Sequence, residues 1–135
     1  MSINIAEWEK FRGGQTLPNN ERVHATIGKT GIIFINKNLH RLWGKPSAVY
    51  LYFNRAKDQI ALEPTSPRLP EAFHVKEKNG SWFIHASPFC RHFGIKLDTT
   101  HMFARPDLSD DGKLLLDLSN IVKIGGIKRE RRKSP

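Results

Sequence analysis

The sequence predicts a mainly β fold with short helices, in which two similar halves share one core. The first observation is a run from Lys29 to Pro64, where strand-like segments flank one short helical segment closed by a glycine. The second is the return of the same order between Lys78 and Ser119. The third is size, because a unit this small cannot bury its own apolar faces and needs a partner.

The first half opens with a half-buried strand at Glu21 to Ile27, where apolar residues alternate with polar ones. We expect Arg22 and His24 on the solvent face of this strand. A second strand, Gly31 to Ile35, is rich in β-branched and aromatic residues and follows a Thr-Gly turn signal.

A short helix is predicted directly after this strand. Asn36 can cap it, because the side-chain oxygen of asparagine accepts a free backbone N–H at a helix start. The helix then runs from Lys37 to Trp43. Gly44 suits the left-handed position that ends a helix, and Pro46 prevents the helix from resuming.

A β-hairpin completes the first half. Val49 to Phe53 reads as its first strand, because apolar residues alternate with tyrosines along it. Asn54 to Gln59 forms a polar turn, and Ile60 to Leu62 forms the return strand, which Pro64 ends.

The second half repeats these elements with one extra residue between strand and helix. Gly80 corresponds to Gly31, Ser81–Ile84 to Ile32–Ile35, Phe89 to Leu39, Arg91 to Arg41, Phe93 to Trp43 and Gly94 to Gly44. Ser87 is a possible helix cap, and Ala72 to Lys76 stands for the first strand of this half. We expect a closing hairpin with strands at Thr99 to Arg105 and Lys113 to Leu118.

Composition divides the chain into five segments. They are an N-terminal helix and linker at 1–20, a first half at 21–65, a linker at 66–71, a second half at 72–120 that shares its core with the first, and a basic tail at 121–135. The N-terminal helix is expected to cover the core or to dock a protein partner.

The run GIIFINKNLHRLWG resembles the AbrB/SpoVT-type DNA-binding fold. The matching positions are Gly31, Ile33, Ile35, Leu39, Arg41 and Gly44. The resemblance implies a swapped-hairpin β-barrel formed by two βαββ-type halves. The tandem arrangement within one chain is similar to that of MraZ-type transcriptional regulators.

Charge is unevenly distributed along the sequence. The chain carries a formal net charge of +9. Residues 21–65 contribute +4, residues 66–120 are neutral, and the tail contributes +5. This asymmetry predicts that the first half and the tail contact a polyanion, against the alternative of an ordinary solvated surface.

The expected DNA contacts are therefore basic and imidazole side chains of the first half and the tail. They are Arg22, His24, Lys29, Lys37, His40, Arg41, Lys45, Lys128, Arg129, Arg131 and Arg132. By resemblance, Lys29, Lys37, His40 and Arg41 lie near the DNA surface around one strand–helix junction. Such groups bind backbone phosphates, while arginine and histidine also read groove edges and DNA shape.

Other classes of site find little support. Zinc sites need converging ligands, usually in close pairs, and Cys90 with His92 is the one loose pair, so no metal or other cofactor is expected. No catalytic constellation is recognisable, so we expect no enzyme. No apolar run approaches the ~20 residues of a membrane span, and one cysteine is compatible with a cytoplasmic protein.

The sequence thus predicts a regulator that binds double-stranded DNA. A homodimer would suit this function, since a symmetric pair doubles a small footprint. One alternative is a non-catalytic interaction module, such as an antitoxin that holds a protein partner. Another is an RNA or single-strand binder that stacks bases on Tyr50, Tyr52, Trp82 and Phe83.

Overall fold

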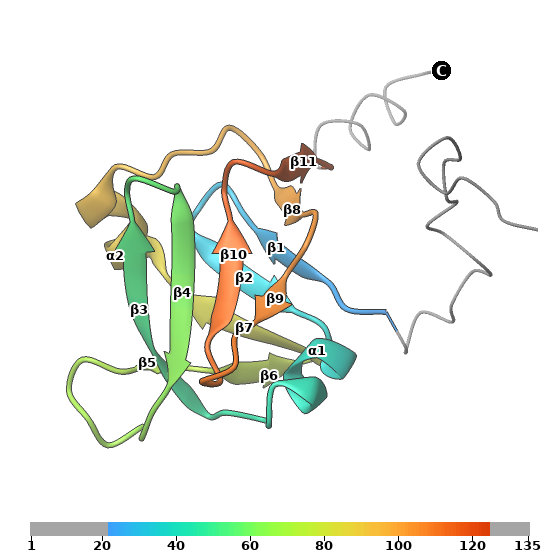
Figure 1. Cartoon of the computed structure of the whole chain (residues 1–135), viewed down its shortest axis with the longest axis vertical. Coiled ribbons are helices and arrows are strands. Elements are labelled where there is room, and N and C mark those ends of the chain that lie inside the picture. The colour runs from blue at the N-terminus through green and yellow to red at the C-terminus, as the bar shows by residue number, and fades with distance from the viewer. Residues whose placement is uncertain (1–21, 125–135) are drawn as a thin grey trace, which may run out of the picture.

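Two antiparallel sheets enclose one apolar core in the computed structural model, which describes residues 22–124 (Figure 1). Sheet A has the order β11 (Ile121–Lys123), β8 (His101–Phe103), β1 (Ala25–Ile27), β2 (Ile32–Ile35), β7 (Ser81–His85) and β6 (Lys76–Lys78). Sheet B has the order β5 (Phe73–His74), β3 (Ala48–Asn54), β4 (Gln59–Pro64), β10 (Leu114–Asp117) and β9 (Asp107–Leu108). The prediction of a mainly β fold with short helices is confirmed. Neither sheet closes on itself within residues 22–124, so the barrel is not seen as a closed sheet.

The two helices lie at opposite ends of the molecule, α1 (Lys37–Leu42) below and α2 (Ser87–Phe93) above (Figure 1). The predicted cap of α1 is confirmed, because Asn36 Oδ1 accepts from Leu39 N at 3.1 Å. The predicted cap of α2 is wrong. Ser87 is already the first helical residue, and its hydroxyl donates instead to the carbonyl of Thr30.

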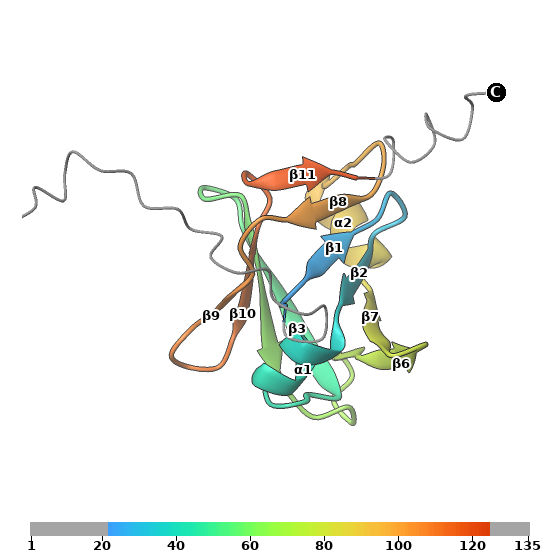
Figure 2. The ribbon, with the colours of Figure 1, turned by 90° about the vertical axis from the view of Figure 1, so that its right-hand side faces the viewer.

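The central strands are arranged about a pseudo-two-fold axis between β2 and β7. Phe34 lies opposite Phe83, its counterpart in the sequence repeat. The two flanking pairs, Ile33–Ile84 and Ile35–Trp82, are related to each other by this axis, since Ile33 corresponds to Trp82 and Ile35 to Ile84 in the repeat. In sheet B the two hairpins β3–β4 and β9–β10 meet through β4 and β10. Each sheet therefore joins strands from both parts of the chain (Figure 2).

The predicted closing hairpin of the second half is wrong. The strand at Thr99 to Arg105 is β8, which pairs with β1 and β11 in sheet A. The chain then crosses to sheet B, where β9 becomes the hairpin partner of β10. Pro106 separates β8 from β9 and lacks the N–H that would continue a ladder. The predicted strand at Ala72 to Lys76 likewise divides into β5 and β6, which belong to different sheets.

The core is built from isoleucine and leucine side chains of both sheets. Ile27, Ile33, Ile84, Ile60 and Leu114 are fully buried and belong to one cluster. Because each part of the chain supplies strands to both sheets, the core belongs to neither part alone. In the part of the chain that the structure describes, no helix has the length and apolarity needed to cross a membrane.

Candidate nucleic-acid interface

Charges segregate between the two sides of the described fold. The sheet-A side, defined as residues 22–47, 75–103 and 121–124, includes both helices. It carries ten basic side chains, which are Arg22, Lys29, Lys37, Arg41, Lys45, Lys76, Lys78, Arg91, Lys96 and Lys123, against the acids Glu77 and Asp98. The sheet-B side, residues 48–74 and 104–120, carries five basic and seven acidic side chains.

This distribution differs from the one expected along the sequence. The second half appeared neutral because its acids and bases cancel in the count. The fold assigns them to different sheets, since Lys76, Lys78, Arg91 and Lys96 belong to the sheet-A side, while the acidic β9–β10 hairpin belongs to sheet B and only its turn reaches the α1 end. The four basic residues were missed as candidates. For Arg91, the sequence did hold a signal, because Arg91 occupies the position in the second half that corresponds to Arg41 in the first.

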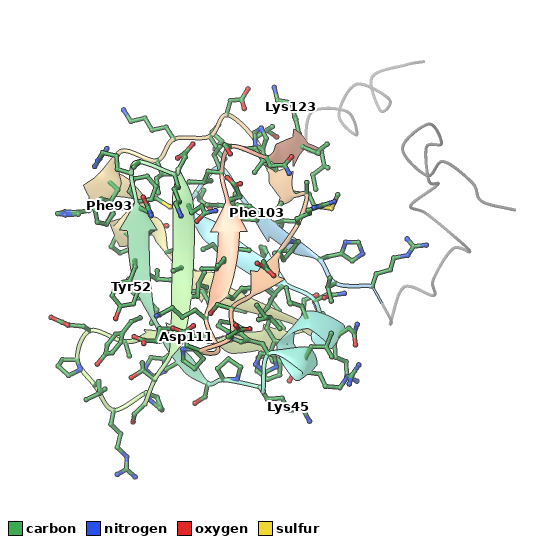
Figure 3. The ribbon with its side chains drawn as sticks, viewed as in Figure 1. Lys45, Tyr52, Phe93, Phe103, Asp111 and Lys123 are labelled. Carbon is green, nitrogen blue, oxygen red and sulfur yellow. The ribbon has the colours of Figure 1, made fainter. Side chains whose placement is uncertain are left out.

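The end of the molecule at α1 gathers several predicted contacts. Lys37, Arg41 and Lys45 are exposed, and Figure 3 shows Lys45 just beyond the helix. Arg22 and His24 are held close to this helix, because the Asn36 side chain donates to Arg22 O at 2.5 Å and accepts from His24 N at 3.1 Å.

The α1 end also receives the turn between β9 and β10. Trp43 Nε1 donates to Gly112 O at 2.9 Å and fixes this turn against the helix. The turn brings Asp111, whose carboxylate pairs with Lys113 at 2.7 Å. The lysine, as hydrogen-bond donor, lowers the pKa of Asp111 to about 2, and Ser109 contributes a second hydrogen bond. Its negative charge thus has a lysine partner on the same turn.

Lys29 is not at this end, so the predicted cluster of Lys29, Lys37 and Arg41 around one junction is wrong. Lys29 lies in the turn before β2, and Lys37 follows β2. A strand rises about 3.3 Å per residue, which places the two ends of β2 far apart. Lys29 instead lines a hollow beside α2 together with Arg91 and Lys96.

The prediction that His40 contacts DNA is also wrong, because His40 is a core residue. Its side chain is 3% exposed, and its ring stacks on Trp82 with centroids 3.9 Å apart. Its Nε2 lies 2.9 Å from the carbonyl oxygen of Pro46, which can only accept, so Nε2 donates. Burial lowers the pKa of His40, which favours the neutral ring.

The outer face of sheet A combines aromatic and basic side chains. Phe34 is 39% exposed, although its neighbours Ile33 and Ile35 are buried. Its ring centroid lies 5.9 Å from that of Phe83, and the Phe83 ring meets His85 edge-on at 5.1 Å. Lys76 pairs with Phe83 across the strands and therefore shares this face. The face thus offers flat rings next to cationic groups.

The aromatic residues predicted to stack bases are only partly on this face. Phe83 is there, but Trp82 packs under His40. Tyr52 belongs to sheet B and donates to Glu63 at 2.7 Å. Phe34 and His85 were missed, because a run such as Ile32–Ile35 reads as fully apolar and hides the one side chain that faces solvent.

The remaining candidates have simpler descriptions. Cys90 is buried, and burial raises the pKa of its thiol, which disfavours the nucleophilic thiolate. Within residues 22–124, no group of three or more histidine, cysteine or acidic side chains converges as a metal site would require. The predicted N-terminal helix and the tail contacts Lys128, Arg129, Arg131 and Arg132 lie outside the described residues.

The arrangement can therefore bind anions over a broad surface through exposed cations. Comparisons with protein-family models, with curated proteins and with solved structures found no match to this chain.

Proposed function

We propose that this protein is a cytoplasmic regulator that binds duplex DNA through its sheet-A side, with an AbrB-like swapped-hairpin arrangement of its two halves. The observation that carries the proposal is the excess of ten basic over two acidic side chains on that side, while the sheet-B side is slightly acidic. A one-sided positive field attracts a polyanion and orients it toward one surface.

Two clusters of cations would make the principal phosphate contacts. One contains Lys37, Arg41 and Lys45 at the α1 end, and the other contains Arg91 and Lys96 at the α2 end. Of the two acids on this side, Asp98 is paired with Lys123 at 2.8 Å. Glu77 pairs across the strands with Trp82 and so shares the face of the His40–Trp82 stack, opposite to Lys76. Self-association would double this footprint on DNA.

The test is a salt-resolved binding titration with random duplex DNA. Lys37→Glu combined with Lys96→Glu removes positive charge from the sheet-A side, and Lys57→Glu combined with Arg68→Glu makes the same charge change on the sheet-B side. We expect the first pair to weaken binding at least about tenfold and to flatten the salt dependence, since each lost phosphate contact reduces the slope by about 0.9. Equal effects of the two pairs would refute the proposed surface.

A second candidate function is binding of single-stranded nucleic acid. The observation that favours it is the exposed Phe34 ring beside Phe83 and His85, with Lys76 on the same face. Stacking of a base on an aromatic ring is worth about 1–3 kcal/mol. Competition between duplex and single-stranded probes of equal length, repeated with Phe34→Ala, separates the two candidates. Duplex preference and insensitivity to the Phe34 substitution would exclude the second.

A further inference from the structure

A hollow of about 600 Å³ lies between the β1–β2 turn and α2. Apolar side chains line part of it, among them Cys90, Ile95 and Leu97. Lys29, Arg91 and Lys96 line it as well, and no carboxylate does. Its size falls within the range of about 300–1,000 Å³ that small-molecule sites occupy.

The two ends of the molecule differ in how the space between helix and sheet is filled. At the α1 end, the ring of His40 stacks on that of Trp82. The pseudo-two-fold relation places Cys90 where His40 stands and Ile33 where Trp82 stands. Both replacements are smaller, and the hollow at the α2 end lies against Cys90.

Hydrogen bonds join α2 to the β1–β2 turn at the wall of the hollow. Ala86 N donates to Gly31 O at 3.0 Å, and the Ser87 hydroxyl donates to Thr30 O. The β1–β2 turn and α2 approach so closely that a Cβ at Gly31 would lie 2.9 Å from the Ser87 Cα. The site is therefore preformed and would not need to order itself around a ligand.

The charge around the hollow selects the kind of ligand. Three cations face no lining carboxylate, and the nearby Asp98 is engaged by Lys123 at 2.8 Å. A guanidinium and two ammonium groups stabilise a carboxylate, phosphate or sulfonate. The apolar part of the lining gains free energy by covering a hydrocarbon or an aromatic ring. A metal ion or an uncharged polyol would use neither feature.

We propose that this hollow binds a small amphiphilic anion, with its apolar body over Ile95 and Leu97 beside Cys90 and its anionic group toward Lys29, Arg91 and Lys96. The inference does not rest on the proposed function, because it concerns a small ligand and needs no nucleic acid.

The probe is 2-naphthoate, and its uncharged counterpart is 2-naphthylmethanol. Calorimetric titration of the full chain with 2-naphthoate is expected to saturate with a Kd of about 1 mM or below, a modest affinity for a ligand of this size. We expect 2-naphthylmethanol to bind at least about tenfold more weakly, since it leaves the cations without an anionic partner.

Two variants locate the site. Arg91→Glu combined with Lys96→Glu should weaken 2-naphthoate at least about tenfold, and both positions are exposed, so the fold should tolerate the change. Lys57→Glu combined with Arg68→Glu makes the same change in net charge on the sheet-B side and should leave the affinity within about twofold. Thermal unfolding of each variant without ligand checks that it is folded.

Cys90 provides an independent readout, because it is the only cysteine of the chain and lines the hollow. Bound 2-naphthoate should slow its alkylation by iodoacetamide, as followed by mass spectrometry. The proposal is overturned by absence of saturable binding, by equal affinity for the uncharged probe, or by unchanged affinity in the Arg91 and Lys96 variant. None of these outcomes affects the duplex-binding test, which uses no small ligand.

Discussion

The α1 end and the α2 end have the same plan, a hairpin turn from one half against a helix from the other, but different interiors. At the α1 end, Asn36 caps the helix and His40 stacks on Trp82. At the α2 end, no side chain caps the helix, and a hollow lies against Cys90. Corresponding elements therefore form a packed end and an open end, and the ends differ in their side chains and in how closely the turn before the strand approaches the helix.

The largest expected effect contrasts the two turn glycines. Gly31 and Gly80 share a left-handed φ, +85° and +83°, but only a Cβ at Gly31 would meet the helix backbone. We expect Gly31→Ala to lower the free energy of unfolding by about 3 kcal/mol, from backbone strain and overpacking together. Gly80→Ala should cost about 1 kcal/mol, from strain alone. Urea denaturation of both variants measures the difference, and equal losses would show that the close contact at Ser87 does not matter.

The next effect concerns the packed end. His40→Ala removes a buried stacked ring and leaves the Pro46 carbonyl without this partner, so a loss of about 2–3 kcal/mol is expected. Its counterpart, Cys90→Ala, removes one sulfur atom beside an existing hollow and should cost about 1 kcal/mol. Denaturation midpoints of the two variants test this order. The comparison of interiors fails if Cys90→Ala proves the more damaging.

A third prediction compares how the ends contact DNA. Lys37→Ala with Lys45→Ala at one end, and Arg91→Ala with Lys96→Ala at the other, each remove two exposed cations. If both ends contact phosphates, each pair should reduce the salt slope by about 1.8 and the affinity by about tenfold at low salt. A change confined to one pair in fluorescence-anisotropy titrations would restrict the interface to that end.

The smallest effect is a pH dependence of the packed end. Burial, the principal cause, lowers the pKa of His40 in the native state, and Lys45 acts in the same direction. The unfolded chain then binds the proton more tightly, so this contribution to stability is full above the ordinary pKa of about 6.5 and declines as the pH falls below it. Wild type and His40→Gln should therefore converge in unfolding free energy between pH 7.5 and 5. A gap that widens on acidification would contradict this sign.

Local chemistry was the part of the fold that the sequence could predict. The strand Gly31–Ile35, the Asn36 cap and the helix-ending Gly44 depend on neighbouring residues only, and the structure contains them. The partner of β8 depends on contacts distant in sequence. Alternation identifies a strand and its buried face, but it does not reveal which sheet the strand joins.

The candidate site shows the same division. Exposure of Lys37, Arg41 and Lys45 follows from the helix pattern, whereas the contribution of Arg91 and Lys96 to the same side required the fold. His40 was placed near the DNA surface by the family resemblance. Its position next to Leu39 and three residues before Trp43, which both face the core, would have placed it at the edge of the buried face.

Because each half supplies strands to both sheets, the fold should survive cleavage of the chain between the halves. The exposed segment 66–71 is the bridge between two parts that pair through β2 with β7 and through β4 with β10. The fragment on either side of this segment lacks part of the hydrophobic core. Each fragment alone would therefore expose unpaired strand edges that the other fragment covers in the intact chain. Cleavage of the chain within 66–71 would leave the two fragments associated through the hydrogen bonds between these strands. Two copies of the chain carry the same complementary strand edges and could therefore exchange halves by domain swapping.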